Sequence, residues 1–105
     1  MNRFSDNLKT LGSVENLAAL ELRDAQGCVV AHIENKAGSQ GSLAVYAHLL
    51  ARFGELNSQA AQLGLVLYAE HTEDAKRYPG KHPNIDRLIQ VIDSNEILSM
   101  DLIDK

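Results

Sequence analysis

Charged and histidine side chains crowd into one segment of the chain, residues 70–87, EHTEDAKRYPGKHPNIDR. Eight of the protein's 24 charged residues and two of its four histidines stand there. An imidazole titrates near neutral pH, so His71 or His82 could act as a general acid or base, with Glu70 orienting the ring. No nucleophile is identifiable beside them. The catalytic residues therefore stay unknown, with these three as the candidates.

The basic residues of the same segment suit an anionic ligand. Arg77 and Lys81 stand in it, and Lys36 comes from an earlier loop. Pro83 restricts His82 to an extended conformation, so the sequence predicts that this stretch is held more rigidly than an ordinary polar loop. The acidic residues of the segment could instead pair with the bases as a solvated network, which dense mixed charge usually forms. Both interpretations stay open.

A second candidate for anion binding is the stretch 35–42, NKAGSQGS, which precedes a helical pattern. It places Gly38, Ser39, Gly41 and Ser42 at a helix start, where unpaired backbone N–H groups and the helix dipole favour an anion. The order of residues matches neither a P-loop, nor a dinucleotide fingerprint, nor a nucleophile elbow. A tight turn followed by an ordinary N-cap at Ser42 also explains these residues, and such residues commonly do no more than cap a helix.

The sequence predicts no metal site and no cofactor. The eleven-residue spacing of His71 and His82 matches no ligand motif such as H-E-x-x-H. Cys28 is the only cysteine, which excludes an intrachain disulfide and a thiolate cluster. We expect its thiol to be packed inside a strand.

The spacing of apolar residues predicts the elements that position these loops. They are a helix over 3–11, a hairpin over 20–23 and 28–34, a helix from 42 to 63, a strand over 65–69 (LVLYA), a helix from 84 and a strand over 98–102. The predicted fold is an α+β two-layer sandwich with a four-stranded mixed sheet, helices mainly on one face, and the order αββαβαβ.

This order makes a prediction about the two loops. Two strands joined through one long helix are normally parallel, with a right-handed crossover. The strand-to-helix loops 35–42 and 70–87 would then share one edge of the sheet and form one ligand site. Gly54 provides the alternative, because it could end the helix and let Asn57 cap a new one. The two strands would then be antiparallel and the loops would separate.

Size and charge narrow the classes of function. A chain of 105 residues with 45% hydrophobic content fits a single domain, 1–105. The net charge of -4 makes a broad nucleic-acid surface unlikely on electrostatic grounds. The amino terminus has no apolar signal region and no run is long enough to span a membrane, so we expect a cytoplasmic protein without a membrane segment.

Several runs of the chain resemble a small family of uncharacterised bacterial proteins of similar length, a domain of unknown function. They are IENK from Ile33, GSQGSL from Gly38, AEHT from Ala69 and PGKHPNIDRL from Pro79. The resemblance covers most of the chain. It implies a bacterial source and no particular activity.

The best-supported function from sequence is a module that binds a small phosphate- or carboxylate-bearing anion. The ligand-binding candidates are Lys36, Gly38, Ser39, Gly41, Ser42, Arg77, Lys81 and His82. The first alternative is a protein-interaction domain or a homodimer, with the charged segment as its recognition surface. The second is a hydrolase or transferase that uses His71 or His82. The balance favours a protein that is not an enzyme.

Overall fold

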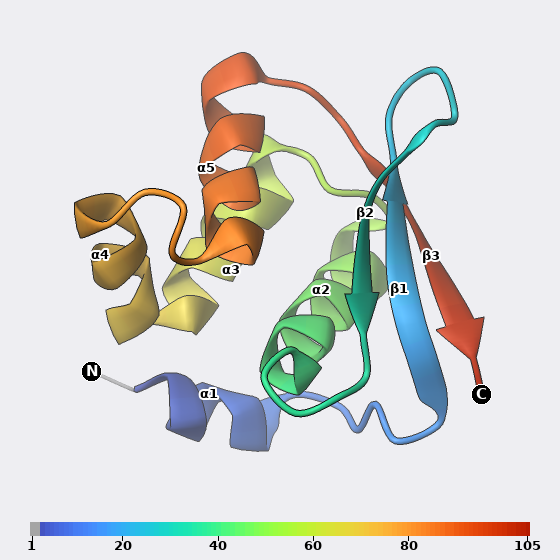
Figure 1. Cartoon of the computed structure of the whole chain (residues 1–105), viewed down its shortest axis with the longest axis horizontal. Helices are drawn as coiled ribbons and strands as arrows, with labels where there is room; N and C mark the ends of the chain where they lie inside the picture. Colours follow the sequence, from blue (N-terminus) through green and yellow to red (C-terminus); the bar gives the residue numbers. More distant parts are fainter. Residues whose placement is uncertain (1–2) are drawn as a thin grey trace.

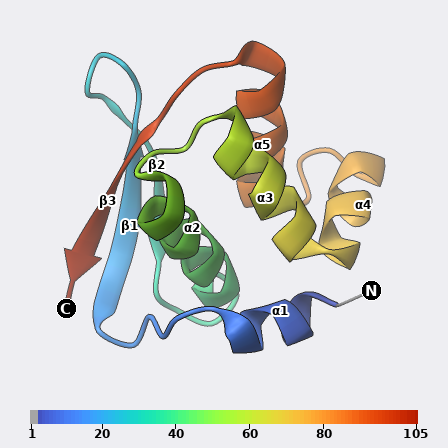
Figure 2. The ribbon, with the colours of Figure 1, turned by 180° about the vertical axis from the view of Figure 1, so that it is seen from behind.

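The computed structural model describes residues 3–105, which form five helices and three strands (Figure 1). Their bounds are α1 Phe4–Thr10, β1 Leu17–Arg23, β2 Val29–Glu34, α2 Gln40–Phe53, α3 Ser58–Tyr68, α4 Glu70–Arg77, α5 Pro83–Ser94 and β3 Ser99–Asp104. The helices lie on one side of the sheet, as the views from front and back both show (Figures 1 and 2). The hairpin, the first helix and the last strand confirm the sequence-based predictions.

The sheet is antiparallel, with the strand order β2-β1-β3. In the central strand, Leu20 pairs with Ile33 of β2 and with Leu102 of β3. Leu20 and Ile33 are buried against the helices. On the other face, Arg23 lies 3.4 Å from Glu21 and 3.3 Å from an oxygen of Asp101. Hydrophobic residues therefore face the helices, whereas the face without helices carries ion pairs.

The core lies between this sheet and the helices. Leu43, Tyr46 and Leu49 of α2 are fully buried, as are Leu88 and Val91 of α5. These residues recur every three or four positions along their helices, which is the spacing that puts side chains on one helical face. Burial of that face fixes the start of α2 and the start of α5 relative to the sheet.

The predicted four-stranded mixed sheet with the order αββαβαβ is wrong, because the apolar run LVLYA is not a strand. Residues 65–68 belong to α3, in which Tyr68 is buried and Val66 is 69% exposed. A short, continuous apolar run does not distinguish a buried strand from a helix. Gly64 is what the helical packing requires: a Cβ there would lie 2.7 Å from Leu88 Cδ1 and 3.1 Å from Leu49 Cδ1. The absence of a side chain lets α3 pack closely against α5 and α2.

Gly54 decides between the two alternatives that the sequence left open. It has a left-handed backbone with φ of +78°, and its N–H donates to Leu50 O at 2.8 Å. The side chain of Asn57 then accepts a hydrogen bond from the N–H of Ala60 at 2.9 Å and caps α3. The predicted long helix is thus broken into α2 and α3. The predicted parallel crossover does not form.

The segment 70–87, predicted as a loop, is mostly helical. Glu70–Arg77 forms α4 and Pro83 begins α5, so the connection between the two helices is short. The first turn of α4 carries Glu70 and Glu73, and its last turn carries Lys76 and Arg77. Acidic side chains at the start of a helix and basic side chains at its end interact favourably with the helix dipole. This charge order was visible in the sequence and predicts a helix better than a loop.

The structure also bears on two smaller expectations, the burial of Cys28 and the lack of a membrane-spanning helix. Cys28 is exposed at the hairpin turn, so the prediction that its thiol packs inside a strand is wrong. Among residues 3–105, no helix is long and apolar enough to cross a membrane. The cytoplasmic location and the single domain over 1–105 stay predictions.

Candidate functional site

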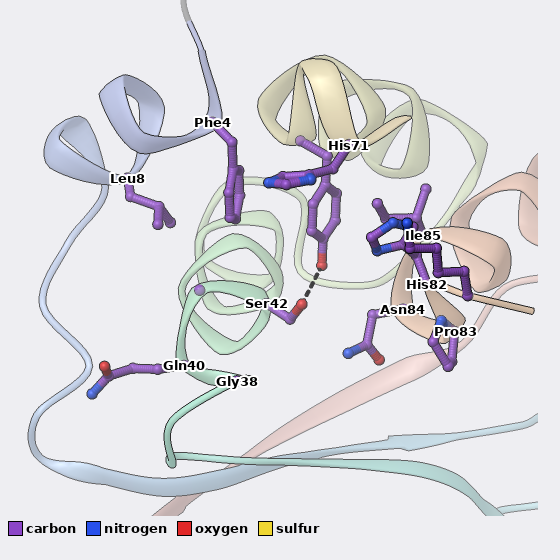
Figure 3. A pocket seen from close by; sticks show the side chains of 13 residues that line it. Phe4, Leu8, Gly38, Gln40, Ser42, His71, His82, Pro83, Asn84 and Ile85 are labelled. Atoms are coloured by element: carbon purple, nitrogen blue, oxygen red, sulfur yellow. Dashed lines mark hydrogen bonds between the residues drawn. The ribbon is translucent and has the colours of Figure 1, made fainter. Parts of the chain in front are cut away.

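A cleft of about 480 Å³ opens beside the amino-terminal ends of α2 and α5 (Figure 3). It is lined by Phe4, Leu8, Gly38, Gln40, Gly41, Ser42, Tyr68, His71, Lys81, His82, Pro83, Asn84 and Ile85. Residues 38–42 and 81–85 thus meet around one space, although no parallel pair of strands brings them together. They meet because α2 packs on the sheet and α3 packs against both α2 and α5, with the starts of α2 and α5 on the same side (Figure 1).

The cleft includes most of the residues that the sequence nominated, but not all. Gly38, Gly41, Ser42, Lys81 and His82 line it, and so does the weaker candidate His71. Three other ligand-binding candidates do not. Lys36 pairs with Glu34 at 3.6 Å, and Ser39 Oγ donates to Glu34 O at 2.6 Å. Arg77 is exposed at the end of α4.

Three backbone donors of the cleft lack an acceptor. Neither the N-cap of α2, Ser39, nor that of α5, His82, accepts a side-chain capping bond. Within residues 3–105, the N–H groups of Gly41, Ser42 and Asn84 have no hydrogen-bond acceptor. The first N–H groups of a helix point out of its start and carry partial positive charge. Both helix starts therefore present donors at the cleft.

Two buried tyrosines fix the polar groups around these helix starts. Burial raises the pKa of Tyr68 far above its usual value, so its hydroxyl stays protonated and donates to Ser42 Oγ at 2.7 Å. The Ser42 hydroxyl keeps its own hydrogen for another acceptor. Burial also raises the pKa of Tyr46 to about 12, and its hydroxyl donates to the backbone oxygen of Asn84.

Arg87 carries a half-buried positive charge next to Asn84. Its Nη1 donates to the Tyr46 hydroxyl oxygen at 3.1 Å and to Asn84 Oδ1 at 2.8 Å. The residue is half-buried, and no carboxylate within residues 3–105 forms an ion pair with it. A partly desolvated guanidinium without a counter-charge adds positive potential next to the cleft.

Asp74 holds the two basic residues of the α4–α5 connection. His82 Nε2 lies 2.7 Å from Asp74 Oδ2, and Lys81 Nζ lies 3.0 Å from the same oxygen. The hydrogen bonds from His82 and from Lys81 lower the pKa of Asp74, which keeps its carboxylate charged. With Nε2 donating to Asp74, a neutral His82 leaves Nδ1 as an acceptor.

Glu70 is not the residue that orients His82. Its Oε1 accepts a hydrogen bond from the N–H of Phe4 at 2.7 Å, and this bond lowers the pKa of Glu70. It thereby ties α1 to α4. Asp74, and not Glu70, is the carboxylate that orients the imidazole ring of His82.

Aromatic and imidazole rings form one side of the cleft (Figure 3). The rings of Phe4 and Tyr68 stack with centroids 5.3 Å apart, and His71 meets Phe4 edge-on at 5.1 Å. The centroids of His71 and His82 are 5.7 Å apart. In the part of the chain that the structure describes, no three or more His, Cys, Asp or Glu side chains form a group that could hold a metal ion.

Sequence reasoning missed several lining residues. Phe4 and Leu8 read as the apolar face of a short helix, and Tyr68 lay inside the supposed strand. The helix predicted from residue 84 begins at Pro83, so Asn84 lies inside the first turn of α5, after the N-cap His82. Nothing in the spacing of Phe4 or Leu8 distinguishes a cleft wall from an ordinary core contact. Only the position of α1 over Gly41 does, since a Cβ at Gly41 would lie 3.1 Å from Phe4 Cζ.

The ion pairs of Asp74 predict a pH-dependent contribution to stability. A carboxyl group whose pKa is lowered by folding stabilises the protein above its unfolded-state pKa, about 3.9 for Asp, and loses that contribution as the pH falls through the folded-state value. We expect Asp74→Asn to unfold at lower urea concentration than the wild type at pH 7. The difference should shrink below about pH 4.

The control for this prediction is Asp104→Asn, at an exposed position outside the ion pairs of residues 3–105. It should change the midpoint of urea unfolding little at pH 7. An Asp74→Asn variant that matched the wild type at pH 7 would show that the pairs contribute nothing to stability.

The fold and the cleft define an α+β domain with a one-sided antiparallel sheet and a space of ligand size. A model of a protein family described as an uncharacterized protein conserved in bacteria (DUF2322) matches residues 4–102. The chain therefore belongs to this family, which confirms the resemblance seen in its sequence. No curated protein and no solved structure matches the chain significantly.

Proposed function

We propose that the protein binds a small molecule bearing a carboxylate or phosphate group in the cleft between the starts of α2 and α5. The observation that carries this proposal is the charge of the lining. Lys81, His71 and His82 line the cleft, and no acidic side chain of residues 3–105 does. Acidic residues outnumber basic ones by fourteen to ten in the whole chain, so this local bias runs against the composition. A basic concave surface attracts anions.

The hydrogen-bonding groups support the same proposal. The unpaired N–H groups of Gly41, Ser42 and Asn84, and the hydroxyl hydrogen of Ser42, are donors that an anion can satisfy. Lys81 supplies a positive charge, which the carboxylate of Asp74 holds in place and partly offsets. In this proposal Lys36 and Arg77 contribute only long-range potential, because neither lines the cleft.

A thermal-unfolding panel tests the proposal. A ligand present at 100 times its dissociation constant adds roughly 2.7 kcal/mol of stability, which is several degrees of melting temperature for a domain of this size. The panel contains acetate, benzoate, inorganic phosphate and a nucleoside monophosphate at constant ionic strength. Benzamide, an uncharged analogue of benzoate, and sodium chloride serve as controls.

We expect at least one of the anions to raise the melting temperature by several degrees, with no comparable shift from benzamide or chloride. A flat panel would contradict the proposal, and so would an equal shift from benzamide. The role of His71 or His82 in a hydrolase or transferase stays a prediction, as does self-association or a protein partner. The pair of His82 with Asp74 is the arrangement that an acid–base role would use.

A further inference from the structure

We infer that the ligand of the cleft is a monocarboxylate with an apolar body, such as an aromatic ring or a branched chain. Its carboxylate would meet the starts of α2 and α5, and its body would lie against α1. This inference rests on the proposed function and narrows it to one class of ligand. It follows from the size of the cleft, its apolar wall and its modest charge.

The cleft is too large for a bare inorganic anion. Its volume of about 480 Å³ falls among the roughly 300–1,000 Å³ of small-molecule sites. An acetate or phosphate ion would occupy only the part next to the donors. The rest of the cleft must meet either water or the body of a larger ligand.

Apolar side chains line much of the rest of the cleft. Phe4 and Leu8 of α1 line one side of the cleft, and Pro83 and Ile85 line it at the start of α5 (Figure 3). None of the residues of α1 is fully buried, so its apolar side chains retain surface that a ligand can cover. The stacking of Phe4 on Tyr68 holds this wall in position before any ligand binds. An apolar ligand body would remove this surface from water, which is favourable.

The positive charge around the cleft matches a ligand with one negative charge rather than several. Among residues 3–105, Lys81 is the one lysine that lines the cleft, and Asp74 at 3.0 Å offsets much of its charge. Each helix start contributes the equivalent of about half a positive charge. The two starts together therefore match a monoanion. Arg87 adds positive potential but does not line the cleft, and its Nη1 is hydrogen-bonded to Tyr46 and Asn84. A nucleoside di- or triphosphate would find too few cations, and phosphate recognition typically uses paired Arg or Lys side chains.

Isothermal titration with a graded series of anions tests the inference. The series is acetate, isovalerate and 3-phenylpropionate, with inorganic phosphate and a nucleoside monophosphate for comparison. Weak members are measured by displacement of 3-phenylpropionate. We expect 3-phenylpropionate to bind at least tenfold more tightly than acetate, and more tightly than either phosphate compound.

Variants of Leu8 locate the apolar body. Leu8→Gln should weaken the binding of 3-phenylpropionate at least threefold and leave the affinity for acetate unchanged. Leu8→Met, which keeps the apolar volume, should bind both carboxylates like the wild type. Leu102→Gln, at an exposed leucine of β3, is the matched control and should bind both like the wild type. Circular dichroism and the melting temperature of each variant show that it is folded.

The outcomes separate this inference from the proposed function. Equal affinity for acetate and 3-phenylpropionate would overturn the claim that the ligand has an apolar body. Tighter binding of a phosphate compound would overturn the claim that its charged group is a carboxylate. In both cases the proposal of anion binding would stand. An effect of Leu8→Gln equal to that of Leu102→Gln would also overturn the inference. Binding of no anion at all would overturn both proposals.

Discussion

Leu88→Ala is expected to lower the free energy of unfolding by about 2–5 kcal/mol, the range for large-to-small changes in a core. Leu88 is fully buried on α5 and packs against Gly64 of α3. Because Gly64 has no side chain that could move into the vacated space, the cavity should stay open. A cavity that does not collapse places the expected loss in the upper half of that range. Urea unfolding at pH 7 measures it.

The control for this change is Val66→Ala, on the neighbouring helix α3. Val66 is 69% exposed, so its replacement should alter the free energy of unfolding by no more than about 0.5 kcal/mol. A loss below about 1 kcal/mol for Leu88→Ala would contradict the close packing of α3 on α5. It would also reopen the assignment of residues 65–68 to a helix.

Lys81→Gln is expected to weaken the binding of benzoate at least tenfold. Lys81 is the one lysine of residues 3–105 that lines the cleft, and its Nζ also lies 3.0 Å from Asp74. Its loss removes an attraction and leaves the carboxylate of Asp74 less compensated, so both effects oppose an anion. A tenfold change in affinity corresponds to about 1.4 kcal/mol, a modest demand for a unit charge near a protein surface. Titration calorimetry at low salt measures the change.

Lys76→Gln is the matched control, because it changes the net charge of the protein by the same amount. Lys76 pairs with Glu73 on α4 at 4.0 Å and does not line the cleft. It should bind benzoate within about twofold of the wild type, since screening in salt limits long-range effects. Equal weakening by both variants would mean that net charge, and not the cleft, governs binding.

Much of the fold could be predicted from apolar spacing alone. The hairpin of β1 and β2, the last strand and the helix beginning near Asn84 all follow patterns with one clear period. The run at residues 65–69 had no period, because each of its residues is apolar. Its helical state depends on Gly64 fitting against Leu88 and Leu49, which is a tertiary contact. Local sequence does not contain that information.

The candidate site was predicted with mixed success. The sequence grouped the stretches 35–42 and 70–87. The structure places part of each around one cleft, but Lys36, Ser39 and Arg77 do not line it. The reason given for the grouping, a parallel crossover, is wrong, and so is the expectation that a break at Gly54 would separate the two stretches. What brings them together is the common packing of α2 and α5. The wall formed by α1 could not be predicted, because a seven-residue helix carries no signal for its docking position.

The most direct test of anion binding in the cleft is an amide NMR titration of the protein with benzoate. Binding in the cleft should cause saturable shifts at the backbone N–H groups of Gly41, Ser42 and Asn84, which have no acceptor in residues 3–105. Amides of the distant hairpin turn, such as that of Gly27, should not move. The absence of saturable shifts at Gly41, Ser42 and Asn84, or saturable shifts confined to another surface, would contradict the account.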